Sequence, residues 1–142
     1  MLATYACIFF HDFKRLWRSE KLATSYIDDN AVNRRMAQVL FQKLGWEVET
    51  LDSGERALLH LASHCPDLVL LDISMPGMNG LEVCQRIRAD HALAGLRVIA
   101  YTAHALPEEQ QRFLAGGFDA VLVKPTSFRA IQELLSAQTQ CP

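Results

Sequence analysis

The feature that most constrains the fold of this chain is a regular alternation, from residue 22 onward, of short apolar runs and amphipathic stretches. The apolar runs predict five strands, at residues 22–27, 46–51, 68–71, 98–101 and 120–123. Strands that alternate with helical patterns are typical of a parallel sheet with helices on its faces. Because right-handed crossovers are strongly favoured, the order predicts an α/β fold of the (βα)5 type, with a doubly wound five-stranded parallel sheet.

The stretches between these runs carry helix-start and helix-end signals. Asn30 is well placed to cap a first helix and Gly45 to end it, while Ser53 begins a second helix. Apolar residues at helical spacing outline a third helix after Gly80, a fourth before the Gly116–Gly117 pair and a fifth around residue 131. In a fold of this kind the ligand site is expected at the carboxyl ends of the strands.

Length and composition limit the remaining possibilities. A chain of 142 residues can bury one core without disulfides or a structural metal. We divide it into an N-terminal extension (1–21), one domain (22–137) and a C-terminal tail (138–142). A net charge of -2 gives no support for direct nucleic acid binding, and no apolar run reaches the length of a membrane span. The cysteines form no CxxC pair, which favours a reducing, cytoplasmic location.

Three acidic side chains are predicted to meet at one rim of the sheet. Asp28 and Asp29 directly follow the first predicted strand, and Asp72 ends the third. Carboxylates brought together in this way repel one another, and a divalent cation is the simplest compensation. A set of oxygen ligands suits Mg²⁺, which usually keeps several waters and leaves room for a phosphate. The cluster therefore predicts a metal site that handles phosphate.

Two further polar residues follow strands at the same rim. Lys124 comes directly after the fifth strand, where its ammonium can pair with a carboxylate or a transferred phosphoryl oxygen. Thr102 ends the fourth strand, and its hydroxyl can donate to a phosphoryl oxygen if the following loop moves inward. Together with the acids, these groups can stabilise charge on a phosphoryl group during its transfer.

The order and spacing of four motifs resemble the receiver domain of two-component response regulators, which has a flavodoxin-like fold. The motifs are Ile27-Asp28-Asp29-Asn30, the segments 68–80 and 98–103, and Val-Leu-Val-Lys-Pro at 121–125. Residues 22 to about 137 carry the resemblance, so it covers nearly the whole domain. The amino-acid sequence of segments 28–33 and 102–105 is similar in particular to that of receivers of hybrid histidine kinases and of receivers that cooperate with them.

The resemblance implies a role for each strand-end group. Asp72 becomes the phosphoacceptor, Thr102 the switch hydroxyl and Lys124 the catalytic cation. The implied ligands of Mg²⁺, or of Mn²⁺, are Asp28, Asp29, Asp72 and the backbone carbonyl of Ser74. The chain would accept a phosphoryl group from a phosphohistidine of a histidine kinase or a histidine phosphotransfer protein. It would then catalyse only its own phosphorylation and dephosphorylation, and would not be an enzyme acting on a separate substrate.

The output of such a domain is a change in protein-protein contacts. In the family this face is the fourth helix, fifth strand and fifth helix, which corresponds here to residues 105–137. Its partner would be a downstream protein effector, with homodimer formation as an open alternative and no direct nucleic acid binding. The family usually has a Tyr or Phe three residues before the lysine, where this chain has Val121, and Tyr101 is a candidate substitute for that aromatic ring.

Two other functions remain open from the sequence. An aspartate-nucleophile phosphatase of small substrates is the first, although such enzymes usually show Asp-x-Asp, and here Ile73 and Ser74 follow Asp72. A degenerate receiver used as a scaffold is the second, because of Val121 and a first strand that is unusually polar. The three readings differ in their response to acetyl phosphate and Mg²⁺.

Overall fold

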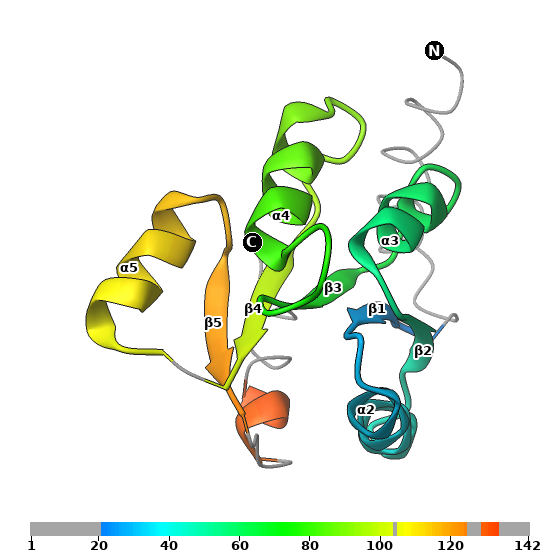
Figure 1. Cartoon of the computed structure of the whole chain (residues 1–142). Coiled ribbons are helices and arrows are strands. Elements are labelled where there is room, and N and C mark those ends of the chain that lie inside the picture. Colours follow the sequence, from blue (N-terminus) through cyan, green and yellow to red (C-terminus); the bar gives the residue numbers. More distant parts are fainter. Residues whose placement is uncertain (1–20, 104, 125–128, 134–142) are drawn as a thin grey trace.

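A computed structural model describes residues 21–103, 105–124 and 129–133. Within them, five parallel strands form one sheet (Figure 1) in the order β2-β1-β3-β4-β5. The strands are β1 (Ala23–Ile27), β2 (Glu47–Leu51), β3 (Leu68–Asp72), β4 (Val98–Thr102) and β5 (Ala120–Val123). This arrangement confirms the predicted doubly wound α/β fold, because β1 lies inside the sheet and the chain winds outward from it in both directions.

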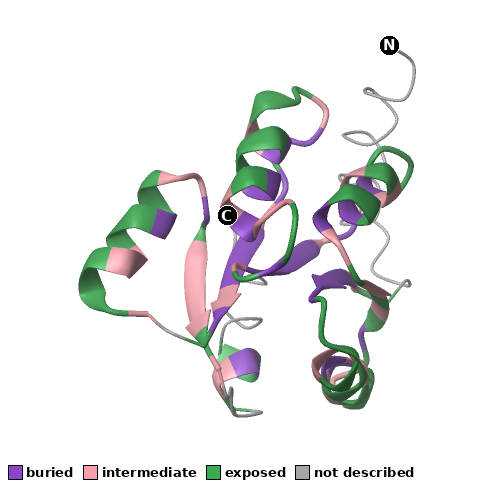
Figure 2. Cartoon of the chain, in the orientation of Figure 1, coloured by how far each residue is buried: buried purple, intermediate pink, exposed green. Residues whose placement is uncertain are grey.

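The helices cover both faces of the sheet. They are α2 (Ala31–Lys43), α3 (Gly54–Leu61), α4 (Gly80–Ala89) and α5 (Pro107–Ala115), and residues 129–133 are also helical. A first core cluster packs α3, α4 and α5 against one face, and a second packs α2 and Ile131 against the other. β3, at the centre, is buried along its whole length (Figure 2), as a strand covered on both sides must be.

The strand boundaries differ from the predicted ranges by a single residue. The first two strands begin one residue later than expected, at Ala23 and Glu47. The third and fourth extend to Asp72 and Thr102, because these residues still pair with Tyr101 and Val123 of the neighbouring strands. Both polar residues are therefore held by the sheet itself rather than by the loops that follow it.

The predicted capping residues of the first two helices are confirmed. The Asn30 side chain accepts hydrogen bonds from the backbone N–H groups of Val32 and Asn33, and the Ser53 hydroxyl accepts one from the N–H of Arg56. Gly45 has a φ of 82° directly after the last turn of α2, a left-handed conformation that glycine adopts without strain. These caps fix where α2 and α3 begin, just beyond the carboxyl ends of β1 and β2.

Several predictions concern residues outside the described part of the chain. These are the N-terminal extension apart from Lys21, the C-terminal tail, Pro125 and the ends of the fifth helix. Among the described residues, no helix combines the length and the apolar character needed to cross a membrane.

Candidate functional site

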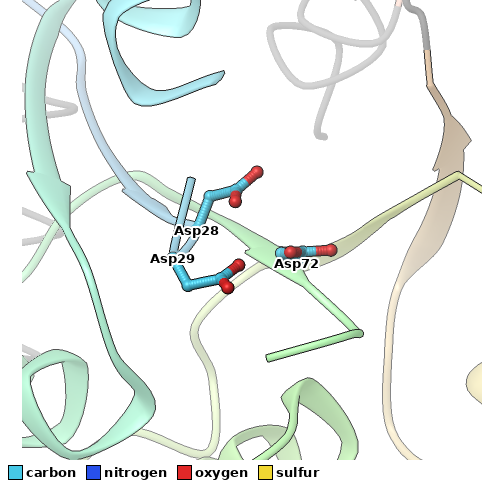
Figure 3. A group of neighbouring side chains, drawn as sticks. All are labelled: Asp28, Asp29 and Asp72. Carbon is cyan, nitrogen blue, oxygen red and sulfur yellow. The ribbon is translucent and has the colours of Figure 1, made fainter. Parts of the chain in front are cut away.

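Three carboxylates converge at the carboxyl ends of β1 and β3. The two strands pair in parallel, with Ile27 opposite Leu71, so that the residues after Ile27 and Leu71 emerge side by side. Asp28, Asp29 and Asp72 each offer an oxygen, and these three oxygens lie within 4.8 Å of one another (Figure 3). The structure thus brings together the acids that the sequence placed at one rim.

Asp28 is fully buried, and its carboxylate accepts four hydrogen bonds from the described residues. Its Oδ2 receives the Tyr26 hydroxyl at 2.6 Å, the Lys124 Nζ at 2.8 Å and the Asn33 side-chain amide at 3.1 Å. Its Oδ1 receives the backbone N–H of Asn30 at 2.9 Å. Burial opposes ionisation, but the bonds from Lys124 and Tyr26 outweigh it and hold the pKa of Asp28 below its ordinary value. Asp28 is therefore a fixed negative charge.

Asp72 is also buried, but it is less well compensated. The Lys124 Nζ lies 3.4 Å from its Oδ1, and the backbone N–H of Ser74 donates to its carboxylate. Burial first, and then the negative charge of Asp28, raise the pKa of Asp72 to about 6. The carboxylate is therefore ionised at neutral pH, yet more basic than an ordinary aspartate, which suits a nucleophile.

Lys124 joins the two buried acids. Its backbone N–H donates to the carbonyl of Thr102 at 2.8 Å, which fixes the start of its side chain at the end of β5. The Nζ then reaches Asp28 and Asp72 and lies 4.9 Å from the centre of the Tyr101 ring. Burial alone would lower the pKa of Lys124, but the bond to Asp28 and the charge of Asp72 raise it, so the ammonium stays charged.

The residues at this rim fit a hard divalent cation. All three grouped side chains are carboxylates, the oxygen ligands that Mg²⁺ prefers. Asp29 is exposed while Asp28 and Asp72 are buried, so the cluster has one side that opens to solvent. Ser74, also exposed, contacts Asp72 through its N–H, and its carbonyl remains a predicted ligand.

Thr102 and Val121 lie on the same face of the sheet. Thr102 is buried at the end of β4, and Val121 packs against the first core cluster. Side chains alternate along a strand, so Thr102 shares the face of Ala100, which belongs to the same cluster. Tyr101 packs against the second cluster, on the opposite face. Its ring is therefore not a substitute for an aromatic residue at the position of Val121.

Sequence reasoning missed two residues that support the acids, Tyr26 and Asn33, and it expected Gly80 only to help shape the loop beside Asp72. Tyr26 precedes Asp28 by two positions in an extended segment, a spacing that places both side chains on one face and could have signalled the contact. A Cβ atom on Gly80 would collide with the backbone carbonyl oxygen of Asp72 and lie 2.9 Å from the Cα of Ile73. Only the folded structure reveals that close approach.

Comparisons with known proteins agree on one family. The family model described as the response regulator receiver domain matches residues 25–136. The chain is 37% identical over 114 residues to the sensor histidine kinase RcsC of Salmonella typhi, covering 80% of this chain but 12% of the kinase. It is 37% identical over 101 residues to the polar-differentiation response regulator DivK of Brucella ovis, covering 71% of this chain and 82% of DivK.

Solved structures give the same result. The chemotaxis protein CheY4 of Vibrio cholerae matches with a TM-score of 0.78 at 27% identity, over 83% of this chain and 98% of CheY4. The chain thus spans about an eighth of the length of the sensor kinases it matches and most of the length of DivK and CheY4. The segment matched by the family model includes all the strand-end groups described above.

Proposed function

Because the chain belongs to the response regulator receiver family, we propose that Asp72 is its phosphoacceptor and takes a phosphoryl group from a phosphohistidine. The chain is a receiver domain of two-component signal transduction, and neither a phosphatase of small substrates nor a degenerate scaffold is favoured. The observation that carries the proposal is the position of the Asp72 carboxylate, buried between two other acids and the Lys124 ammonium.

The transfer is a displacement at phosphorus. An oxygen of Asp72 attacks, the phosphorus–nitrogen bond of the phosphohistidine breaks, and its electron pair returns to the imidazole. The products are an acyl phosphate on Asp72 and a free histidine. Attack of water at the same phosphorus later releases inorganic phosphate and restores the carboxylate. Lys124 supplies a positive charge beside the transferred oxygens, because its Nζ lies 3.4 Å from Asp72 Oδ1.

We assign Mg²⁺ or Mn²⁺ to the site, held by Asp28, Asp29, Asp72 and the Ser74 carbonyl. The three carboxylates support this assignment, because each offers an oxygen and these oxygens lie within 4.8 Å of one another. The bound ion supplies positive charge that offsets the repulsion between the carboxylates and the phosphoryl oxygens.

The output follows from the charge added to Asp72. Thr102 and Lys124 donate to the phosphoryl oxygens, and the loop after β4 closes inward. This closure changes the proposed output face within residues 105–137, of which α5 and β5 belong to the described part of the chain. The proposed partners are a histidine kinase or histidine phosphotransfer protein upstream and a protein effector downstream, in the cytoplasm, with a homodimer as a further arrangement.

Phosphorylation with a small donor tests the proposal. The full chain is incubated with Mg²⁺ and acetyl phosphate, and its intact mass is measured over time. We expect the addition of one phosphoryl group, lost in Asp72→Asn and retained in Asp52→Asn, which removes an exposed acid beside α3. Continuous release of phosphate without a modified protein would indicate a phosphatase, and no response to acetyl phosphate or beryllofluoride would indicate a scaffold.

A further inference from the structure

Tyr26 places a buried hydroxyl inside the acidic cluster. The residue lies in β1 with no exposed surface, and its ring packs edge-on against Tyr101 at a centroid distance of 5.8 Å. Its hydroxyl donates the shortest of the hydrogen bonds to Asp28, at 2.6 Å. Because the ring is enclosed by the second core cluster, the hydroxyl has little freedom to move away from this position.

The hydrogen bonds on Asp28 are unevenly shared between its two oxygens. Oδ2 accepts from Tyr26, Lys124 and Asn33, which exceeds the two lone pairs of a carboxylate oxygen. Within the described part of the chain, Oδ1 accepts only the N–H of Asn30, which leaves one of its lone pairs unused. A cation or a cation-bound water must therefore approach Asp28 through Oδ1. The donors that hold Oδ2 fix the orientation of the Asp28 carboxylate and therefore the direction in which Oδ1 points.

One of these donors has a second task. Lys124 Nζ lies 2.8 Å from Asp28 Oδ2 and 3.4 Å from Asp72 Oδ1. This step rests on the proposed function: once Asp72 carries a phosphoryl group, Lys124 donates to the phosphoryl oxygens and its ammonium moves away from Asp28 Oδ2. Tyr26 and Asn33 remain, and of these two only Tyr26 is fixed in the core, since Asn33 is half-buried near the start of α2. Tyr26 can thus hold Asp28 in place both before and after phosphorylation.

We propose that Tyr26 is a positioning residue of this receiver domain. Its hydroxyl anchors Asp28 Oδ2, so that Oδ1 faces the cation while Lys124 is free to move to the phosphoryl group. Groups that orient a metal ligand through a hydrogen bond commonly change metal affinity by 10- to 100-fold when they are removed. Tyr26 acts on the cation site through Asp28 and touches neither the cation nor the phosphoryl group.

The test compares two substitutions that each remove one hydroxyl. Tyr26→Phe keeps the ring and loses the bond to Asp28. Tyr101→Phe is the matched control. Tyr101 contacts Lys124 through its ring, which phenylalanine keeps, and its hydroxyl makes no hydrogen bond with the described residues. Mg²⁺ binding to the full chain is measured by calorimetry. We expect Tyr26→Phe to weaken Mg²⁺ affinity by about tenfold and Tyr101→Phe to leave it unchanged.

A second measurement separates positioning from simple structural support. The Mg²⁺ concentration that half-saturates phosphorylation by acetyl phosphate should rise by the same factor in Tyr26→Phe, while the rate at saturating Mg²⁺ should change by less than threefold. A general loss of packing would instead lower the rate at every Mg²⁺ concentration. That pattern, or an unchanged Mg²⁺ affinity in Tyr26→Phe, overturns the proposal.

The unsubstituted tyrosine provides a test that does not depend on how Tyr26→Phe folds. The chain has three tyrosines, at positions 5, 26 and 101, and all can be replaced by 3-fluorotyrosine. The Tyr26 fluorine resonance, assigned by elimination with Tyr5→Phe and Tyr101→Phe, should shift on Mg²⁺ addition as its hydrogen-bond acceptor gains a cation. A resonance that does not respond contradicts the proposal.

Asp29→Asn distinguishes failure of this inference from failure of the proposed function. If the unsubstituted chain binds Mg²⁺, Asp29→Asn does not, and Tyr26→Phe binds normally, then only the role of Tyr26 is wrong. If the unsubstituted chain binds no Mg²⁺, or Asp29→Asn binds it equally well, then the proposed Mg²⁺ site is wrong. The proposed role of Tyr26 is then wrong as well, because it depends on that site.

Discussion

At the scale of single residues, two buried aspartates of the same cluster have opposite electrostatic surroundings. The Asp28 carboxylate accepts hydrogen bonds from Tyr26 and Lys124, among other described groups, and its pKa is lowered. Burial and the nearby charge of Asp28 raise the pKa of Asp72 to about 6, although Lys124 and Ser74 partly offset them. The supporting groups therefore favour the charge on Asp28 and leave Asp72 more basic than an ordinary aspartate.

This asymmetry gives Asp72→Asn a stabilising effect in the absence of metal. An unfolded aspartate ionises near pH 4, so between about pH 4 and pH 6 the unfolded state binds fewer protons than the folded state. Stability is consequently lost as pH rises through this window. We expect Asp72→Asn to raise the free energy of unfolding by about 2 kcal/mol at pH 7.5 and by much less at pH 4.5, as measured by urea unfolding.

Asp28→Asn should have the opposite sign under the same conditions. The amide removes the charge that pairs with Lys124 at 2.8 Å, and it turns one accepting oxygen into a donor inside a cluster of donors. We expect the free energy of unfolding to fall by about 3 kcal/mol at pH 7.5. Urea unfolding of Asp72→Asn and Asp28→Asn measured in parallel checks both predictions. If both substitutions changed the free energy of unfolding in the same direction, the electrostatic description of the cluster would be wrong.

The sequence was sufficient for the acids and the lysine but not for the groups that orient them. Asp28, Asp72 and Lys124 could be placed together because each follows or ends a strand, and parallel strands end at one rim. The bonds from Tyr26 and Asn33 depend on side-chain rotamers and on the distance between β1 and the start of α2. Such details are not contained in hydrophobic periodicity.

At the scale of elements, the connection from β3 to α4 controls where Asp72 sits. The backbone N–H of Gly80, the first residue of α4, donates to the carbonyl of Ile73 at 3.0 Å. Gly80 is buried, and the space where a Cβ would lie is already taken by the backbone of Asp72 and Ile73. The end of the central strand and the start of α4 are therefore packed backbone to backbone.

Gly80→Ala should disturb this contact. The added methyl must push α4 away from Asp72 or strain the strand end, at a cost of about 2 kcal/mol in the free energy of unfolding. We also expect phosphorylation by acetyl phosphate to slow at least tenfold, because Asp72 moves relative to its supporting groups. Gly95→Ala is the control, since a Cβ there meets no atom within 4 Å. Equal effects of the two substitutions would contradict the close-packing argument.

The positions of the strands and of two helix starts were predictable from the sequence, whereas the order of the strands in the sheet was not. Apolar runs located all five strands to within one residue at each end, and Asn30 and Ser53 marked the starts of two helices. The order β2-β1-β3-β4-β5 depends on pairings between distant segments, which a local pattern does not encode. The contact between Gly80 and Asp72 belongs to the same class of long-range information.

At the scale of the whole molecule, the sheet separates two cores and leaves the acidic cluster at its carboxyl rim. Far from the cluster, Arg88 of α4 binds the carbonyls of Gly117, Ala94 and Leu96 and pairs with Asp119 at 2.8 Å. This contact ties α4 to the turn before β5. The scaffold is thus held together by contacts outside the site, while within the site Lys124 only partly offsets the repulsion between the carboxylates.

Global stability should therefore respond strongly to Mg²⁺. A ligand that binds only the folded state stabilises it by about 2.7 kcal/mol at a hundred times its Kd, which corresponds to a rise of roughly 10 °C in Tm for a chain of this size. We expect this rise in calorimetric scans of the unsubstituted chain and its reversal by a chelator.

The response to Mg²⁺ should depend on the charges of the cluster. Asp29→Asn removes the exposed carboxylate that we propose as a ligand of the ion, so its Tm should hardly change with Mg²⁺. Asp72→Asn removes the same repulsion that the ion neutralises and should start from a higher Tm but gain less from the ion. If all three proteins gained equally, the stabilisation would come from general salt effects, because only a site built from these acids distinguishes them.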